Sequence, residues 1–188
     1  MVPVTALWMP ILASTVLVFI TSNLIWMVLN LHKKDWKPLP DEEALAEVLN
    51  QQKVGEGEYT FPFADGAEDW KSEEWQKRFQ RGPVGFLTLK TPGDMGMGKS
   101  MASWVIYIVI LQIFIAYLTG HARAAGADFA AVFQIAGAAG VLGFAGAVAP
   151  EAIWLGRQWS NVLKTMFDGV VYGLLSAAVF AWLWPAAS

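Results

Sequence analysis

The chain has 188 residues, of which 55% are hydrophobic and 15% are charged, against about 25% charged in an ordinary soluble domain. Its formal net charge of -3 argues against a nucleic-acid-binding protein, which usually carries an excess of basic residues. The absence of cysteine excludes disulfides, thiolate catalysis, iron–sulfur clusters and cysteine-ligated zinc.

Charged side chains are concentrated in one stretch, because all but six of them lie between Lys33 and Lys99. Four long runs outside this stretch contain no charge, and a charge at mid-bilayer is costly. Each run is close to or above the roughly 20 residues that a helix needs to cross the hydrocarbon. The sequence therefore predicts an all-α membrane protein, with transmembrane helices at residues 1–31 and about 100–120, 129–149 and 162–184 within the C-terminal part 100–188.

The polar segment 32–99, between the first and second helices, predicts a small α(+β) structure. Proline and acidic residues at 39–43 suit the first turn of a helix, which we expect to run to about Gln52. Residues 58–63 and 84–89 are extended in character. An apolar side on residues 67–80 indicates a second helix.

Basic residues predict the orientation in the membrane. Lys33, Lys34, Lys37, Lys90 and Lys99 lie in the first loop, Arg157 and Lys164 in or near the third, and only Arg123 in the second. Cytoplasmic loops carry an excess of Lys and Arg. We therefore expect segment 32–99 in the cytoplasm and both termini on the other side, in the periplasm if the membrane is bacterial.

Residues Gly93–Ser100 match the nucleotide-binding pattern G-x-x-x-x-G-K-S. That motif needs a following helix packed on an α/β sheet and a second magnesium ligand. Here a membrane span follows, so we predict that no nucleotide binds and that Lys99 lies at the membrane interface. The two histidines, His32 and His121, flank opposite faces of a bilayer about 30 Å thick. We expect each of them to be an interfacial side chain, and we predict no metal, no cofactor and no catalytic residue.

Small residues on the last two spans indicate close helix packing. The candidate packing residues are Gly137, Gly140, Gly143, Gly169, Gly173 and Ala177. Asp168 is a candidate functional carboxylate, because a carboxylate near membrane depth is costly unless it is paired. The alternative is an interfacial salt bridge. Gln134, inside the third span, is expected to make an interhelical hydrogen bond.

Three stretches carry a family resemblance. These are residues 32–42 (HKKDWKPLPDE), residues 82–88 (GPVGFLT), and the C-terminal part from Ile153–Arg157 (IWLGR) through Trp182–Pro185 (WLWP). The chain resembles a family of small, uncharacterised bacterial inner-membrane proteins over most of its length. The resemblance implies a multi-pass protein of the bacterial inner membrane, and it implies no activity.

Two functional hypotheses follow. The first is an accessory or structural membrane subunit, whose partners are the lipid bilayer and either other membrane subunits or further copies of this chain. The second is a small oligomeric transporter or channel, which normally needs polar groups along a path near the midplane. Asn23, Gln134 and Asp168 are the polar groups that the spans offer. An enzyme is the weakest hypothesis, because the paired carboxylates resemble solvated helix faces.

Overall fold

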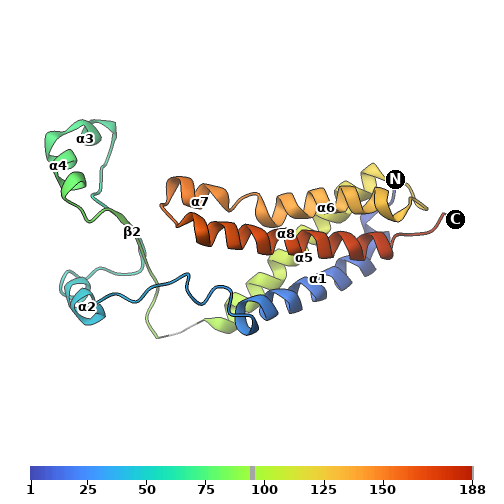
Figure 1. Cartoon of the computed structure of the whole chain (residues 1–188), viewed down its shortest axis with the longest axis horizontal. Helices are drawn as coiled ribbons and strands as arrows, with labels where there is room; N and C mark the ends of the chain where they lie inside the picture. Colours follow the sequence, from blue (N-terminus) through green and yellow to red (C-terminus); the bar gives the residue numbers. More distant parts are fainter. Residues whose placement is uncertain (94–95, 188) are drawn as a thin grey trace. The chain divides into compact units, whose positions relative to one another are not determined.

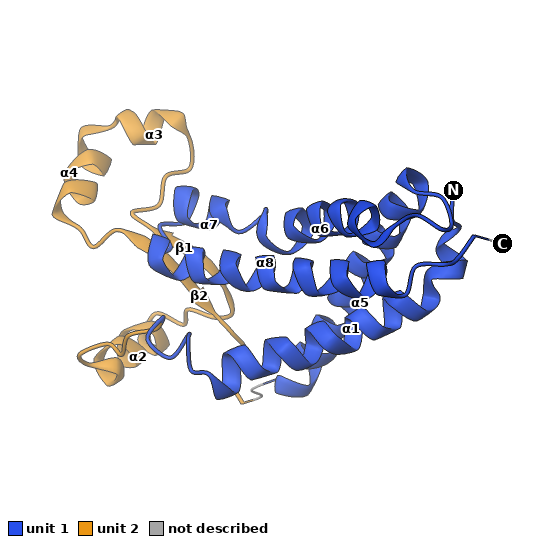
Figure 2. Ribbon diagram, turned by 45° about the vertical axis from the view of Figure 1, so that its right-hand side comes forward, with its two compact units in different colours: residues 1–35, 96–188 blue, residues 36–95 orange. Residues whose placement is uncertain are grey.

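A computed structural model describes residues 1–93 and 96–187. The chain forms two compact units, which Figure 2 distinguishes by colour. Unit 1 consists of residues 1–35 and 96–188, and unit 2 of residues 36–95. The polar segment was predicted to span residues 32–99. Residues 32–35 and 96–99 instead belong to the compact unit that contains the spans.

Unit 1 contains four helices that are long and apolar enough to cross a membrane. The first is Val4–Val28, in which a 3-10 turn, the α-helix α1 (Trp8–Asn23) and a π-helical turn (Leu24–Val28) follow one another. The second is α5 (Met97–Ala122). Neither span begins with a side-chain hydrogen bond that caps its first turn. This is expected where the membrane interface surrounds the end of a helix.

The third candidate span, Phe129–Trp154, consists of two helices, α6 (Phe129–Ala145) and α7 (Ala149–Trp154). The side chain of Asp128 caps α6 by accepting a hydrogen bond from the amide of Ala131 at 2.8 Å, as acidic N-caps commonly do. α8 (Trp159–Trp182) is the fourth span and begins three residues before the predicted start.

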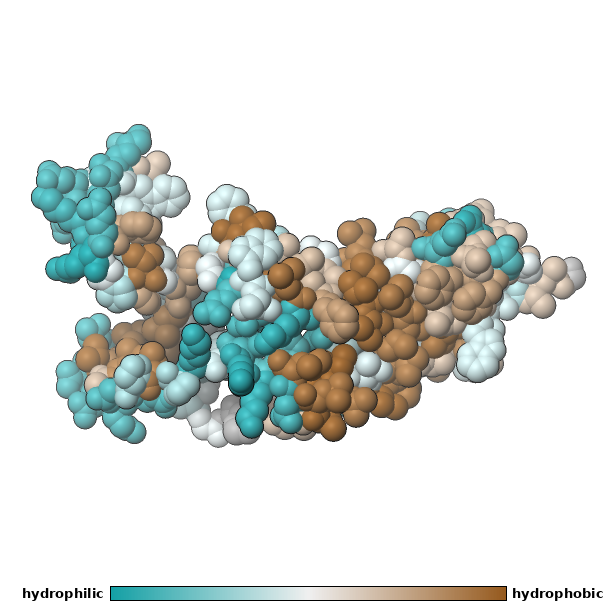
Figure 3. Space-filling model, in the orientation of Figure 1, coloured by the Kyte–Doolittle hydropathy of each residue, from teal (hydrophilic) through white to brown (hydrophobic). Residues whose placement is uncertain are grey.

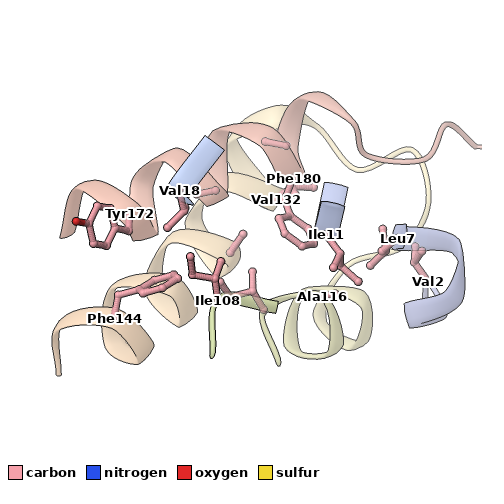
Figure 4. Packing of buried hydrophobic residues seen from close by; sticks show 14 of the residues in the cluster. Val2, Leu7, Ile11, Val18, Ile108, Ala116, Val132, Phe144, Tyr172 and Phe180 are labelled. Carbon is pink, nitrogen blue, oxygen red and sulfur yellow. The ribbon is translucent and has the colours of Figure 1, made fainter. Parts of the chain in front are cut away.

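The helices of unit 1 enclose an apolar core (Figure 4), and α6 lies along α8 (Figure 1). Ile108 of α5, Val132 of α6 and Phe180 of α8 are completely buried in it. Apolar side chains also cover much of the outer surface of these helices on the face shown in Figure 3. Apolar surface both inside and outside is what a bundle surrounded by lipid requires.

Both chain ends lie at the end of unit 1 that carries the α5–α6 loop. The amide of Val2 donates to the carbonyl of Gly120 at 2.8 Å, and the amide of Gly126 donates to the carbonyl of Pro185 at 2.8 Å. Gly126 has φ +77°, a backbone conformation that glycine adopts at low cost. The termini and this loop are therefore at one end of the bundle, as four crossings require.

Unit 2 combines three short helices with a two-stranded sheet. Its elements in chain order are α2 (Glu42–Gln51), β1 (Gly57–Phe61), α3 (Ala67–Lys71), α4 (Glu73–Arg81) and β2 (Gly85–Leu89). β1 and β2 pair antiparallel, in a register that places Tyr59 opposite Leu87. The single helix expected over 67–80 is two helices, because Ser72 is extended and its hydroxyl accepts from the amide of Trp75 to start α4.

Candidate functional site

A cluster of polar side chains lies at the end of unit 1 opposite the termini. It contains a histidine between two carboxylates. The ring of His32 bonds Asp35 through Nδ1 at 2.6 Å and Asp168 through Nε2 at 2.8 Å. Asp35 also accepts a hydrogen bond from Lys164 Nζ at 2.5 Å, and its carbonyl accepts one from the Asn161 amide at 2.9 Å. These five residues are called the polar cluster below.

The local sequence explains how the polar cluster forms. Asn161, Lys164 and Asp168 are spaced three and four apart on α8, which places them on one face of that helix. The first span ends in a π-helical turn, and the chain reverses at Asn30, whose φ is +53°. This reversal brings His32 back onto α8, where the ring of Trp26 stacks on it at a centroid distance of 3.9 Å and an angle of 3°.

Burial makes this arrangement unusual. His32 is 5% exposed and Asp168 is 2% exposed, whereas the Lys164 side chain is 39% exposed. The polar cluster therefore runs from a lysine at the surface, through Asp35 and His32, to a carboxylate inside the bundle. Buried charges are stable when they are paired and hydrogen-bonded, and each member has such a partner.

The pKa of Asp35 is lowered from its ordinary value. Burial alone would raise it, but hydrogen bonds from Lys164 and His32, together with their charges, outweigh the burial. Asp35 therefore carries its negative charge at neutral pH and fixes the position of His32.

Asp168 also borders an interhelical cavity of about 680 Å³. The cavity is mostly apolar, and Met97, Met101, Trp104 and Tyr107 of α5 are among its lining residues. The side chains of Met97 and Tyr107 are exposed, so the cavity opens to the surface of unit 1. Met97 is the first residue of α5 and Tyr107 lies ten residues further, so the lining extends about 15 Å along the helix.

Aromatic rings form one wall of this interhelical cavity. Trp104 stacks on Tyr107 at 5.5 Å and meets the edge of Tyr172 at 6.3 Å, and Phe144 meets Tyr172 at 5.8 Å. Figure 4 shows Phe144 on α6 and Tyr172 on α8. The hydroxyl of Tyr172 is buried and forms no hydrogen bond of normal geometry with the described residues, although Trp26 lies near it. A buried hydroxyl usually has a partner.

The structure brings most of the predicted small residues together between α6 and α8. A Cβ built on Gly140 would lie 2.8 Å from Gly173 Cα, and one on Gly169 would lie 2.6 Å from the carbonyl oxygen of Phe144. Gly137 faces Ala177 at an ordinary 3.5 Å. Gly143 lies apart from this contact and faces a leucine of α5.

Two expectations about polar residues are corrected. Gln134 makes no interhelical hydrogen bond with the described residues and is exposed. The interhelical bond comes instead from Gln112 of α5, which is fully buried and donates to Ser176 of α8 at 2.8 Å. His32 is buried and hydrogen-bonded to Asp35 and Asp168, rather than exposed at the interface. His121 is exposed and bonds the carbonyl of Tyr117 at 2.8 Å.

The partner of Asp168 could not be identified by spacing. Lys164 and Arg157 are the nearby basic residues in sequence, but Lys164 pairs with Asp35 and Arg157 pairs with Glu151. The partner is His32, which lies 136 residues away. The sequence signal for a common site was limited to one ionisable residue at the edge of each of two spans, His32 after the first and Asp168 in the fourth.

The glycine-rich motif Gly93–Ser100 lies partly outside the described residues, at positions 94 and 95. Gly96, with φ +59°, precedes the first turn of α5, and that turn contains Lys99 and Ser100. Among residues 1–93 and 96–187, no group of three or more His, Cys, Asp or Glu side chains is placed to hold a metal ion.

The chain matches no protein-family model, and no curated protein or solved structure is significantly similar to it. The bacterial family resemblance therefore stays a prediction. Four candidate membrane-spanning helices indicate a multi-pass membrane protein. Within the described residues, the polar cluster and the interhelical cavity are the features that support a functional proposal.

Proposed function

We propose that this protein binds an amphipathic small molecule inside the membrane, with its apolar part in the interhelical cavity and its polar head at Asp168. The single observation that supports the proposal is the position of a buried, histidine-paired carboxylate on the wall of an apolar cavity. Ionisable groups at membrane depth are expensive to maintain and usually mark a ligand or ion path.

The size and chemistry of the cavity support the same proposal. Ligand pockets are commonly about 300–1,000 Å³, apolar, and equipped with a few polar groups that orient the ligand. The volume of about 680 Å³ lies inside that range. The buried hydroxyl of Tyr172 supplies a second polar group beside Asp168. A transporter needs a ligand-binding site of this kind, and the sequence alone did not indicate one.

A cavity-filling variant tests the proposal. Met101→Trp places a large ring in the interhelical cavity, whereas Ile110→Trp adds the same ring to an exposed position of α5 outside the lining. We expect wild type and Ile110→Trp, in lipid nanodiscs, to retain a dodecyl-chain amphiphile in native mass spectrometry, and Met101→Trp to lose it. Equal retention by all three proteins would refute the proposed site.

For the orientation, we propose that unit 2 is cytoplasmic, that both termini are periplasmic, and that the membrane is the bacterial inner membrane. The termini share one end of unit 1 with the α5–α6 loop, where Arg123 is the only basic residue besides His121. The opposite end carries Lys33, Lys34, Arg157 and Lys164. This asymmetry supports the positive-inside orientation.

The accessory membrane subunit is the second candidate, and one observation favours it. The Gln134 amide is exposed on α6, at the edge of a shallow groove that also includes Gly137, Ala138 and Val141. A polar amide facing lipid gains by bonding a neighbouring helix, either of another subunit or of a second copy of this chain. Gln134→Leu should then weaken co-purification of this chain with the other subunit or with its second copy. An unchanged complex would count against this role.

A further inference from the structure

The chemistry around the interhelical cavity narrows the class of ligand. Among the described residues, its lining includes one carboxylate, Asp168, and no lysine, arginine or histidine. An anionic head would therefore meet a negative charge with no compensating cation on the cavity wall. A cationic head would meet an opposite charge in surroundings that screen it far less than water does.

The aromatic wall favours the same sign of charge. Trp26, Trp104, Tyr107, Phe144 and Tyr172 all line the cavity. Each ring presents a face of negative electrostatic potential to a cation within about 6 Å, and tryptophan is the best of these partners. Quaternary ammonium heads are bound by rings in this way because they cannot donate strong hydrogen bonds.

The polar cluster positions Asp168 on the cavity wall. Its Oδ2 atom lies 2.8 Å from His32 Nε2, and His32 is held in turn by Asp35 and by the stacked ring of Trp26. The orientation of the carboxylate is therefore set before a cation arrives.

We propose that the cavity selects lipophilic organic cations, with Asp168 as the counter-ion of the cationic head and the aromatic rings packed around it. This selectivity rests on the proposed ligand-binding function.

The selectivity is tested with three dodecyl amphiphiles that differ only in the head: dodecyltrimethylammonium, dodecanol and laurate. In nanodiscs we expect the cation to bind at least about tenfold more tightly than dodecanol, which corresponds to about 1.4 kcal/mol, and laurate to bind most weakly. Asp168→Asn should abolish the preference for the cation and retain dodecanol binding, which also shows that the variant is folded. Glu47→Gln, which removes an exposed carboxylate from α2, should change nothing.

Equal affinities for the cation and dodecanol overturn the selectivity but leave the binding function intact, whereas no binding of any amphiphile overturns both.

Discussion

Gly173 lies where the backbones of α6 and α8 come closest. A Cβ built on it would be 2.5 Å from the backbone nitrogen of Val141 and 2.7 Å from the carbonyl carbon of Gly140. Carbon atoms normally pack at about 3.5–4.0 Å, so Gly173→Ala requires the two helices to separate by about an ångström. The obstacles are backbone atoms, so no rotamer change can relieve the contact.

Overpacking of this kind typically costs about 1–3 kcal/mol. The higher helix propensity of alanine offsets at most about 1 kcal/mol of that cost. For a chain of this length each kcal/mol shifts the unfolding temperature by about 2–4 °C. We therefore expect Gly173→Ala to unfold a few degrees below the wild type, and Gly173→Leu to lose the α6–α8 contact and any assembly that depends on it.

The matched control is Gly137→Ala on α6. Its Cβ would lie at an ordinary 3.5 Å from the Cβ of Ala177, so we expect unchanged or slightly higher stability. Thermal unfolding of the three purified proteins in one detergent, followed by tryptophan fluorescence, makes the comparison. Equal unfolding temperatures for wild type and Gly173→Ala would refute the close-approach reasoning, as would an equal loss in Gly137→Ala.

Three further predictions concern topology, nucleotide binding and pH. Cysteines introduced at Gln52 and Ala125 report the orientation, and an impermeant thiol reagent added to intact cells should label position 125 only; labelling at 52 alone would reverse the topology. Titration with ATP and magnesium should give no specific heat, and stoichiometric binding that Lys99→Ala abolishes would show the prediction to be wrong. The pKa of Asp35 is lowered in the folded protein, so its contribution to stability is complete above the ordinary aspartate pKa of about 3.9 and is lost as pH falls through the folded-state value. Unfolding temperatures should therefore fall with acid more steeply in wild type than in Asp35→Asn. At neutral pH this variant should already be less stable by about 1–3 kcal/mol, because the buried His32 loses a bonding carboxylate. Parallel pH profiles would contradict this role of Asp35.

The positions of the four spans could be predicted from the sequence, because long runs without charge have few alternatives to a membrane helix. The small-residue spacing on α6 and α8 also indicated close packing, either of these helices on each other or on a partner, since Gly140 and Gly173 remove the side chains that would keep backbones apart. The alternation of helices and strands in segment 32–99 was visible from turn residues and acidic first turns. These properties depend on neighbours in the sequence.

The choice between Gln112 and Gln134 depended on the tertiary structure. Both lie on helices that are apolar on all sides, because a side that faces lipid and a side that faces the protein core both carry apolar side chains. The pattern of apolar residues therefore does not indicate which side of such a helix faces inward. Packing of α5 against α1 and α6 turned Gln112 inward, where it bonds Ser176 of α8, and packing of α6 left Gln134 outside.

The polar cluster likewise exists only in the folded chain. Sequence marked Asp168 as a costly carboxylate, but its partner His32 follows a different span, 136 residues earlier. A π-helical turn and the reversal at Asn30 bring the imidazole onto α8. Composition determined that this protein has four apolar helices with few ionisable groups. The tertiary structure decided that His32 and Asp35, which follow the first span, share one buried site with Asp168 of α8. Contacts between distant residues form across space and leave no periodic signal along the chain.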